Sequence, residues 1–285
     1  MTNENTTERS RKAKEFYAPQ LFHDHFQNFK SYNIPRAQLV IADVPYNIGN
    51  NAYASNPSWY KDGDNANGES ALAGKAFFAG DTDFSPAHFM IFCSRLLRKE
   101  GNEKGAAIGN GSKRKSAAPC IVLFAPFEEM HRYIELASDF GFKHYIPLVF
   151  RKDFSAQVLK ANMKVVGNCE YGLILYRDKL PKFNNDGRMV FNCFDWMPDT
   201  ASDNVPKIHP TQKPVRLLKR IIEIFTDPGD VVIDPCAGSA TALRAAAEMG
   251  RRAYGFEIKK PFYEAAQTQM LSNFQPELKL VACEG

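Results

Sequence analysis

Short apolar runs alternate with amphipathic stretches along most of the chain. The runs are three to six residues long and rich in β-branched and aromatic side chains, which is typical of buried parallel strands. They lie at residues 38–42, 121–124, 145–150, 171–176, 231–233, 253–256 and 278–282. The apolar spacing between them predicts helices at 85–99, 128–141, 215–225, 241–249 and 262–271. This alternation predicts an α/β fold with a doubly wound, mostly parallel sheet.

Three stretches interrupt the regular pattern. Residues 50–80 are rich in Asn, Gly, Ala and Ser, which predicts a long loop. Residues 101–118 have little apolar bulk and carry the basic run 113–115, which predicts a mobile surface loop. Residues 153–206 are largely polar and irregular around one predicted strand. We expect this last range to form a small segment within the domain.

Composition fits one globular domain. The chain has 285 residues, 44% of them hydrophobic, which is enough for one large core. We expect a single domain over 1–285, with one half at 20–150 and a second half at 209–285. No apolar run approaches the roughly 18 residues of a membrane span, and residues 1–10 lack a signal-peptide core, so we expect a cytoplasmic protein without membrane contact.

Charge and cysteine content bear on two kinds of partner, nucleic acids and metal ions. A net charge of +4 is modest, so contacts with a nucleic acid would come from local basic clusters at 9–14, 113–115 and 151–152. The six cysteines form no C-x-x-C pair and have no histidine at zinc spacing, which argues against a structural metal.

The segment D-P-C-A-G-S-A-T at 234–241 follows one predicted strand and opens a helix. Its small residues Ala237, Gly238 and Ser239 allow a tight turn that lets a ligand approach the amides at the helix start. The next strand ends at Glu257, about 20 residues on, where a carboxylate can accept hydrogen bonds from ribose hydroxyls. The joint spacing favours a nucleoside-containing cofactor over plain helix–strand packing. A P-loop and a dinucleotide turn are disfavoured, because neither G-K-S/T nor G-x-G-x-x-G is present.

The segment D-V-P-Y at 43–46 lies at the carboxyl end of the first predicted strand, where open α/β sheets bind ligands. Pro45 stiffens the loop, and the Asp43 carboxylate and the Val44 carbonyl offer two hydrogen-bond acceptors. Tyr46 offers a flat apolar face. An exocyclic amino group on a nucleobase has two protons to donate and a ring to stack, so these residues suit its capture.

Three motifs together resemble one enzyme family. Residues 43–49, D-V-P-Y-N-I-G, resemble the D-P-P-Y-N-I-G signature of amino-methyltransferases that act on DNA. Residues 234–241 resemble the family's D-P-F-x-G-S-G-T loop for S-adenosylmethionine, and H-P-T-Q-K-P at 209–214 matches a third segment. The catalytic loop comes first and the cofactor loop last, which is the order of the β class found in restriction-modification and phage enzymes. The resemblance extends over about residues 21–271.

The resemblance implies a Rossmann-like methyltransferase that uses S-adenosylmethionine and no metal, with a target-recognition segment in 153–206. It assigns catalysis to Asp43, Val44, Pro45 and Tyr46. It assigns cofactor binding to Asp24, Thr211, Gln212, Lys213, Asp234, Pro235, Cys236, Ala237, Gly238, Ser239, Thr241 and Glu257. From the residues alone, Asp24 is equally suited to cap a helix, and Lys213 to be a surface cation near a helix start.

The chain departs from the family pattern at three positions. Val44 replaces the first proline of the signature, but the acceptor used there is a backbone carbonyl, which valine keeps. Cys236 replaces the usual aromatic residue and Ala240 the second glycine, which predicts a looser cofactor pocket or a displaced helix start. Neither Cys120 nor Cys236 has the electropositive, open setting that the Pro-Cys nucleophile of cytosine-C5 enzymes needs.

The implied reaction is transfer of a methyl group to N6 of an adenine flipped out of DNA. Aspartate at the first signature position favours adenine; cytosine N4 is the alternative, and an inactive DNA-binding relative is another. DNA, duplex or single-stranded, is the expected partner, with a cognate restriction endonuclease and a second copy of the chain as further candidates. Trp59, Tyr60 and Trp196 are candidates either to stack on bases or to anchor their own loops.

Overall fold

The computed structural model describes residues 17–45, 84–100, 118–153, 157–160, 165–209 and 211–272. Several predictions fall outside these residues: Tyr46, Trp59, Tyr60, the basic clusters at 9–14 and 113–115, the loop at 50–80, nearly all of 101–118, and the strand at 278–282.

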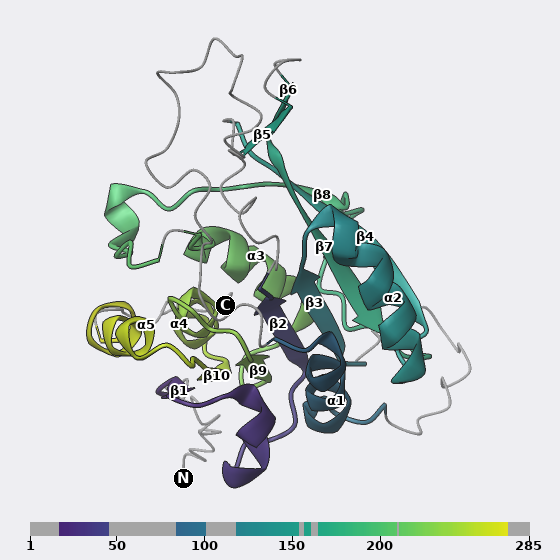
Figure 1. The fold of residues 1–285 in the computed structure, drawn as a ribbon, viewed down its shortest axis with the longest axis horizontal. Helices are drawn as coiled ribbons and strands as arrows, with labels where there is room; N and C mark the ends of the chain where they lie inside the picture. Colours follow the sequence, from purple (N-terminus) through teal and green to yellow (C-terminus); the bar gives the residue numbers. More distant parts are fainter. Residues whose placement is uncertain are drawn as a thin grey trace, which may run out of the picture.

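One eight-stranded sheet runs through the molecule in the order β1-β10-β9-β2-β3-β7-β4-β8 (Figure 1). Every neighbouring pair in it is parallel except the two that include β7. Its strands are β1 (Gln20–Phe22), β2 (Leu39–Asp43), β3 (Cys120–Phe124), β4 (His144–Arg151), β7 (Cys169–Tyr176), β8 (Cys193–Asp195), β9 (Val231–Asp234) and β10 (Arg252–Phe256). A separate antiparallel pair is formed by β5 (Gln157–Lys160) and β6 (Val165–Gly167).

Helices cover both faces of the large sheet (Figure 1). One face packs against α1 (Pro86–Leu96) and α2 (Met130–Asp139). The other face packs against α3 (Val215–Phe225) and α4 (Thr241–Glu248). The helix α5 (Lys260–Ala265) continues as a π-helix over Ala266–Met270. The predicted doubly wound, mostly parallel α/β fold is confirmed.

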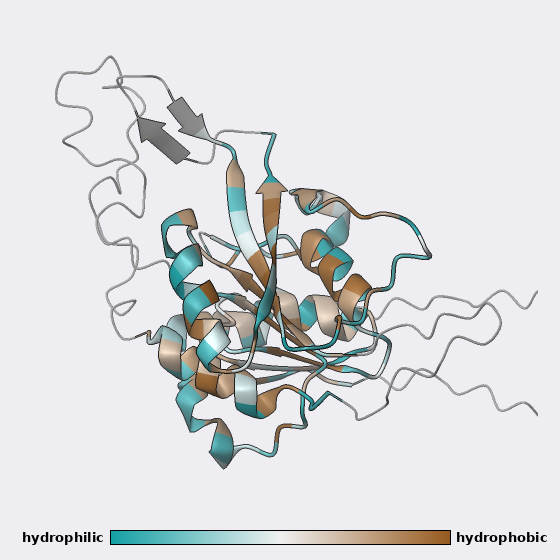
Figure 2. Ribbon diagram, turned by 90° about the vertical axis from the view of Figure 1, so that its right-hand side faces the viewer, coloured by the Kyte–Doolittle hydropathy of each residue, from teal (hydrophilic) through white to brown (hydrophobic). Residues whose placement is uncertain are grey.

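The core lies in two layers, one on each side of the sheet. Along β2, Leu39 and Ile41 belong to the layer beneath α3 and α4, whereas Val40 and Ala42 belong to the layer beneath α1 and α2. All four side chains are buried. Strands buried on both faces have continuous apolar sequences, which is why this run shows no alternation. Figure 2 shows largely brown strands between helices that carry both teal and brown residues.

Local signals located most helices well. Ser85 caps α1, because its side chain accepts a hydrogen bond from the His88 amide at 3.4 Å, and Pro86 is the first helical residue. The predicted helix at 215–225 matches α3. The predicted helix at 262–271 begins earlier, at Lys260. The strand β1 was missed, since three residues make too short a run to recognise.

The range 153–206 is not separate from the sheet. It contains β7 and β8, which are strands of the large sheet. The parts outside that sheet are the β5–β6 pair and the stretch after β7 that includes the 3-10 helix Ala201–Asp203. A target-recognition role for these parts stays a prediction.

Candidate active site

The sheet has a switch point between β9 and β2. From β9 the chain passes through α4 to β10 on one side, and from β2 through α1 to β3 on the other. Open α/β sheets bind ligands at the carboxyl ends of their strands at such a point. Asp43 ends β2 and Asp234 ends β9, so both predicted site residues lie there.

The Asp43 carboxylate has one engaged oxygen and one free oxygen. The Lys213 ammonium donates to Oδ2 at 2.6 Å. The other oxygen, Oδ1, is buried and has no hydrogen-bond partner among the described residues. A buried acceptor without a donor costs free energy, so such an atom in a predicted site marks a place for a donor on a ligand.

Two further charged residues, Glu170 and Lys152, extend this contact. The sequence did not assign either of them to this site. Glu170 lies near the start of β7, and because β7 runs antiparallel, its start lies at the same edge as the end of β2. The Lys213 Nζ is 3.1 Å from Glu170 Oε2, and the Lys152 Nζ binds Glu170 Oε1. The Lys152 Nζ also lies 4.1 Å from the centre of the Trp196 ring. We call Asp43, Lys213, Glu170 and Lys152 the charge row.

Burial sets the protonation of these carboxylates. It raises the pKa of Asp43, against the opposing effect of the Lys213 ammonium. Burial also raises the pKa of Asp234 to about 8, with further contributions from the charges of Asp43 and Glu257. For Glu170, burial acts in the same direction, but the ammonium groups of Lys213 and Lys152 outweigh it and hold the pKa below its usual value.

The predicted cofactor turn lies directly between β9 and α4. Asp234 holds it, since its Oδ1 accepts a hydrogen bond from the Cys236 amide at 2.9 Å. The Ala237 amide donates to the Phe256 carbonyl at 2.9 Å, which ties the turn to β10. The remaining predicted residues follow in order around the turn and into α4: Pro235, Gly238, Ser239 and Thr241.

The backbone of this turn is left-handed at two positions, Gly238 with φ 52° and Ala240 with φ 59°. Left-handed backbone suits glycine and is costly for alanine. A Cβ atom added to Gly238 would come within 4 Å only of the His209 ring, at 3.8 Å. Among the described residues, only the His209 ring comes this close, so the turn leaves room for a ligand beside Gly238.

Glu257 lies beside this turn at the end of β10. Its Oε2 accepts a hydrogen bond from the Gly238 amide at 2.8 Å, and its Oε1 accepts one from the Lys259 amide at 2.7 Å. A carboxylate oxygen can accept more than one hydrogen bond, so capacity for ribose hydroxyls remains. The residues around the turn therefore fit a nucleoside, and the predicted contact stays a prediction.

Asp24 lies just beyond β1, at the same edge of the sheet. Its Oδ1 accepts hydrogen bonds from the His25 amide and the Asn28 side chain, both at 2.7 Å. Its Oδ2 accepts one from the Tyr32 hydroxyl at 2.9 Å. The N-cap of the 3-10 helix Phe26–Ser31 is His25, whose side chain accepts a hydrogen bond from the Gln27 amide at 3.1 Å, so the helix-cap interpretation of Asp24 is wrong. The cofactor contact of Asp24 stays a prediction.

The segment before α3 is held by its own side chains. Gln212 accepts from the Ile208 amide at 3.1 Å and donates to the Pro206 carbonyl at 2.9 Å, which fixes the loop. The Thr211 hydroxyl lies 3.1 Å from the His209 Nδ1. Burial lowers the pKa of His209 to about 4, so the imidazole is neutral at neutral pH.

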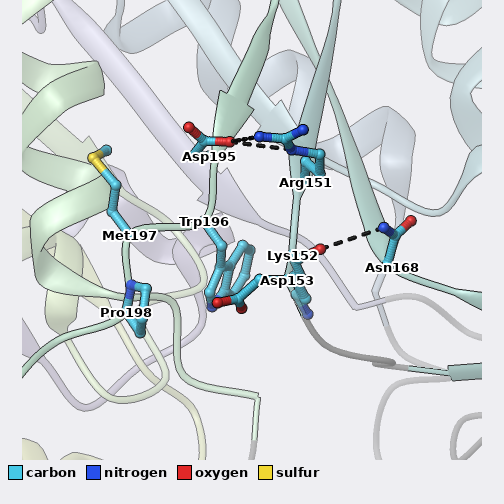
Figure 3. Close-up of a pocket in the computed structure, with 8 residues that line it drawn as sticks. All are labelled: Arg151, Lys152, Asp153, Asn168, Asp195, Trp196, Met197 and Pro198. Carbon is cyan, nitrogen blue, oxygen red and sulfur yellow. Dashed lines mark hydrogen bonds and ion pairs between the residues drawn. The ribbon is translucent and has the colours of Figure 1, made fainter.

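A cavity of about 620 Å³ opens beside the charge row at the ends of β4 and β8 (Figure 3). Its lining residues are Arg151, Lys152, Asp153, Asn168, Asp195, Trp196, Met197 and Pro198. Arg151 donates from two nitrogens to Asp195, at 2.6 and 3.2 Å, and Asn168 donates to the Lys152 carbonyl at 3.3 Å.

The burial of two lining residues, Lys152 and Trp196, tests two expectations from the sequence. Lys152 was expected in a basic surface cluster, but it is buried, because its ammonium pairs with Glu170. Trp196 is only 8% exposed, which agrees with an anchor for its own loop rather than a stacking surface for bases.

Two aromatic rings at this edge were not predicted. Phe127 follows β3 and is 66% exposed, and its ring centre lies 5.4 Å from that of Tyr171. Successive side chains of a strand point to opposite faces, so Tyr171 lies on the face that packs against α1 and α2, whereas Glu170 lies on the other face. The exposed Phe127 ring therefore offers a stacking surface at the carboxyl edge of the sheet, but not beside the charge row.

Three further features were checked among the described residues: reactive cysteines, metal-binding groups and membrane-spanning helices. Burial raises the pKa of Cys120 and of Cys236, so neither thiol is a ready nucleophile. Across those residues, no group of three or more His, Cys, Asp or Glu side chains is placed to hold a metal ion. No helix in the described part of the chain is long and apolar enough to span a membrane.

Comparisons with known proteins agree on one family. The N6_N4_Mtase family model, described as DNA methylase, matches residues 37–268. The chain is 27% identical to the DNA adenine methyltransferase YhdJ of Escherichia coli K12 over 253 residues, which cover 84% of this chain and 78% of YhdJ. It is 30% identical over 150 residues to YubD of the same strain, named as a methylase; this match covers 53% of the chain and 61% of YubD.

Solved structures share the fold. The M1.HpyAVI complex with S-adenosylmethionine superposes with a TM-score of 0.58 at 17% identity, covering 88% of this chain and 98% of that one. The cytosine-N4-specific PvuII DNA methyltransferase superposes with a TM-score of 0.58 at 13% identity, covering 92% of both chains.

Proposed function

The chain belongs to the N6_N4_Mtase family of DNA methylases, and we propose that it transfers a methyl group from S-adenosylmethionine to N6 of an adenine flipped out of DNA. The observation that carries the proposal is the position of Asp43 and the turn after β9. They lie at the ends of adjacent strands at the switch point, and Asp43 Oδ1 has no partner among the described residues. A base amine and a methyl donor would therefore meet at one place.

Asp43 and Val44 would hold the target amine. Asp43 Oδ1 would accept a hydrogen bond from one amino hydrogen and the Val44 carbonyl from the other, which turns the nitrogen lone pair toward the donor methyl. The nitrogen would bond to the methyl carbon as the methyl–sulfur bond breaks to leave a neutral thioether, and would then release one proton to water. Extrusion of the base costs a few kcal/mol, and stacking on an aromatic ring such as Tyr46 returns about 1–3 kcal/mol. The charge of Asp43 also stabilises the positive charge that grows on the nitrogen during transfer.

The turn at 235–240 and Glu257 would hold the donor. S-adenosylmethionine, when bound, supplies an electrophilic methyl group on a sulfonium. Glu257, which already accepts a hydrogen bond from the Gly238 amide, would also accept hydrogen bonds from the ribose hydroxyls, and the space beside Gly238 would accommodate the nucleoside. Positioning of the two reactants on adjacent strands supplies most of the rate enhancement.

Adenine is the favoured base for two reasons. The first signature residue is an aspartate, and a relative matched over 84% of this chain is named as a DNA adenine methyltransferase. Cytosine N4 is the second candidate, because cytosine also carries an exocyclic amine and the PvuII enzyme shares the fold.

The test is a transfer assay with purified protein, unmethylated DNA and S-adenosylmethionine labelled in its methyl group, followed by separation of the nucleosides. We expect the label in N6-methyl-2′-deoxyadenosine. Label in N4-methyl-2′-deoxycytidine would show that cytosine is the target base. No label, together with no heat of cofactor binding in calorimetry, would indicate an inactive DNA-binding relative.

Asp43→Ala tests the central residue. We expect the single-turnover rate to fall by at least about 10²-fold, since the variant loses both an acceptor and the stabilising charge. Cofactor affinity should change little, because the turn at 235–240 is untouched. Asp178→Ala, which removes an exposed carboxylate remote from β2, is the control. Full activity in Asp43→Ala would reject the assigned role.

A further inference from the structure

The charge row alternates in sign across the catalytic edge. Asp43 comes from β2, Lys213 from the segment before α3, Glu170 from β7 and Lys152 from the residue after β4. Lys213 bridges the two carboxylates, at 2.6 Å from Asp43 Oδ2 and 3.1 Å from Glu170 Oε2. Two carboxylates and two ammonium groups thus form one chain of ion pairs.

The row is largely withdrawn from water. The Lys213 and Lys152 side chains are 6% and 9% exposed, and that of Glu170 is 19% exposed. Buried ion pairs often stabilise a fold no better than apolar side chains of similar size. Stability alone is therefore a weak reason for this arrangement. Because Lys213 contacts the proposed catalytic residue Asp43 directly, we look for its role in the reaction.

We propose that Lys213 positions Asp43 for methyl transfer. Its ammonium binds Oδ2, which fixes the rotation of the carboxylate and leaves Oδ1 for the amine of the target base, while Glu170, itself paired with Lys152, holds Lys213 in place. This role differs from the cofactor contact that family resemblance assigns to Lys213. The inference rests on the proposed function, since it concerns the same site.

The row also sets the pH at which Asp43 becomes charged. The charged groups that face Asp43 are Lys213, Glu170, Lys152 and Asp234. The two lysines lower the pKa of Asp43, whereas Glu170 raises it. Asp43 must be ionised to stabilise the growing positive charge, so the rate falls on the acid side as Asp43 takes up a proton. Changes in Lys213 and in Glu170 should move this acid limb in opposite directions.

The experiment measures single-turnover rates against pH, with DNA and S-adenosylmethionine saturating. Lys213→Met should slow transfer by about 10²-fold through misplacement of Asp43, and should move the acid limb to higher pH. Lys213→Arg keeps the charge and should restore part of the rate. Glu170→Gln should lower the rate less and move the acid limb to lower pH. General damage to the fold would not produce shifts of opposite sign.

Lys182 provides a matched control. It also bridges two carboxylates, Asp227 at 2.7 Å and Asp230 at 2.8 Å, and its side chain is 12% exposed. Asp230 immediately precedes β9, so this bridge lies at the opposite edge of the sheet from Asp43. Lys182→Met should leave both the single-turnover rate and the acid limb at their wild-type values.

Two outcomes would overturn the positioning role. One is a Lys213→Met variant that is slow only because it binds cofactor weakly, with its acid limb unmoved. The other is an Asp43 carboxyl whose titration, followed by carbon-13 NMR, is the same in wild type, Lys213→Met and Glu170→Gln. The NMR measurement needs no turnover, so a wild-type protein without activity would count against the proposed function and still test this inference. If Lys213→Met does not fold, the inference is tested by Glu170→Gln alone, through the acid limb of its rate and the carbon-13 titration of its Asp43 carboxyl.

Discussion

At the scale of single residues, Ala240 shows how one side chain can conflict with its backbone. It is fully buried at the start of α4, with φ 59° in the left-handed region. A left-handed conformation costs an L-residue about 1–2 kcal/mol, which glycine avoids. Alanine therefore makes this turn more costly than glycine would, and α4 begins directly after it, at Thr241. A looser pocket or a helix start displaced from that of the family stays a prediction.

A pair of alanine variants isolates this cost. Ala245 lies inside α4 and is equally buried. Ala245→Gly should lower the free energy of unfolding by about 1 kcal/mol, the usual penalty for glycine within a helix. Ala240→Gly should be less damaging by about 1–2 kcal/mol, because it relieves the left-handed strain. Urea denaturation measures both, and equal losses would contradict the strain.

Asp234 makes stability depend on pH. Its pKa is raised to about 8 in the folded protein, against an ordinary value of 3.8, so the folded state holds a proton that the unfolded state releases. The stabilisation is complete below the lower value and is lost as the pH rises toward 8. The free energy of unfolding should fall with rising pH across this window. Asp234→Asn should flatten that slope in urea titrations, and an unchanged slope would show that another group is responsible.

At the scale of elements, the direction of one strand decides what the sequence could predict. The turn after β9 could be predicted, because strand, turn and helix follow one another along the chain. Glu170 and Lys152 could not, because an apolar run such as 171–176 predicts a strand but neither its direction nor its neighbours. The antiparallel course of β7 brings Glu170 to the catalytic edge, and only the sheet order shows this.

The packing of β7 also predicts a sensitive glycine. A Cβ atom at Gly172 would lie 2.7 Å from the Leu123 carbonyl oxygen in β3 and 3.1 Å from the Phe150 ring. Backbone cannot yield easily, so Gly172→Ala should destabilise the protein by about 1–3 kcal/mol. At Gly255 the nearest atom, at 2.8 Å, belongs to the Leu243 side chain, which can move. Gly255→Ala should therefore cost less, and thermal unfolding of the two variants would reveal the reverse order if this account is wrong.

At the scale of the whole molecule, the two edges of the sheet carry different groups. The carboxyl ends carry Asp43, the turn after β9 and the cavity beside β4. The opposite edge carries the ion pairs of Lys182 and Arg98 with Asp230. If DNA binds across the carboxyl ends, cations there should contribute to affinity and equally exposed cations at the far edge should not.

Two cations at opposite ends of β4 test this orientation. Arg151 and Lys143 each pair with one aspartate, and their side chains are 62% and 60% exposed. Arg151→Ala should weaken DNA binding and reduce the slope of log affinity against log salt by about 1, as expected for one lost phosphate contact. Lys143→Ala should leave both unchanged. Equal effects of the two variants, measured by fluorescence anisotropy, would contradict the orientation.

The reversed strand has one more consequence. Because β4 and β7 are antiparallel, β4 ends and β7 begins at the edge of the sheet that carries Asp43. The β5–β6 pair belongs to that connection. Lengthening or exchanging it would leave the strands of the large sheet in register. If this pair recognises DNA, as we predict, a change of DNA target would need new residues in this connection and none in the strand that carries Asp43.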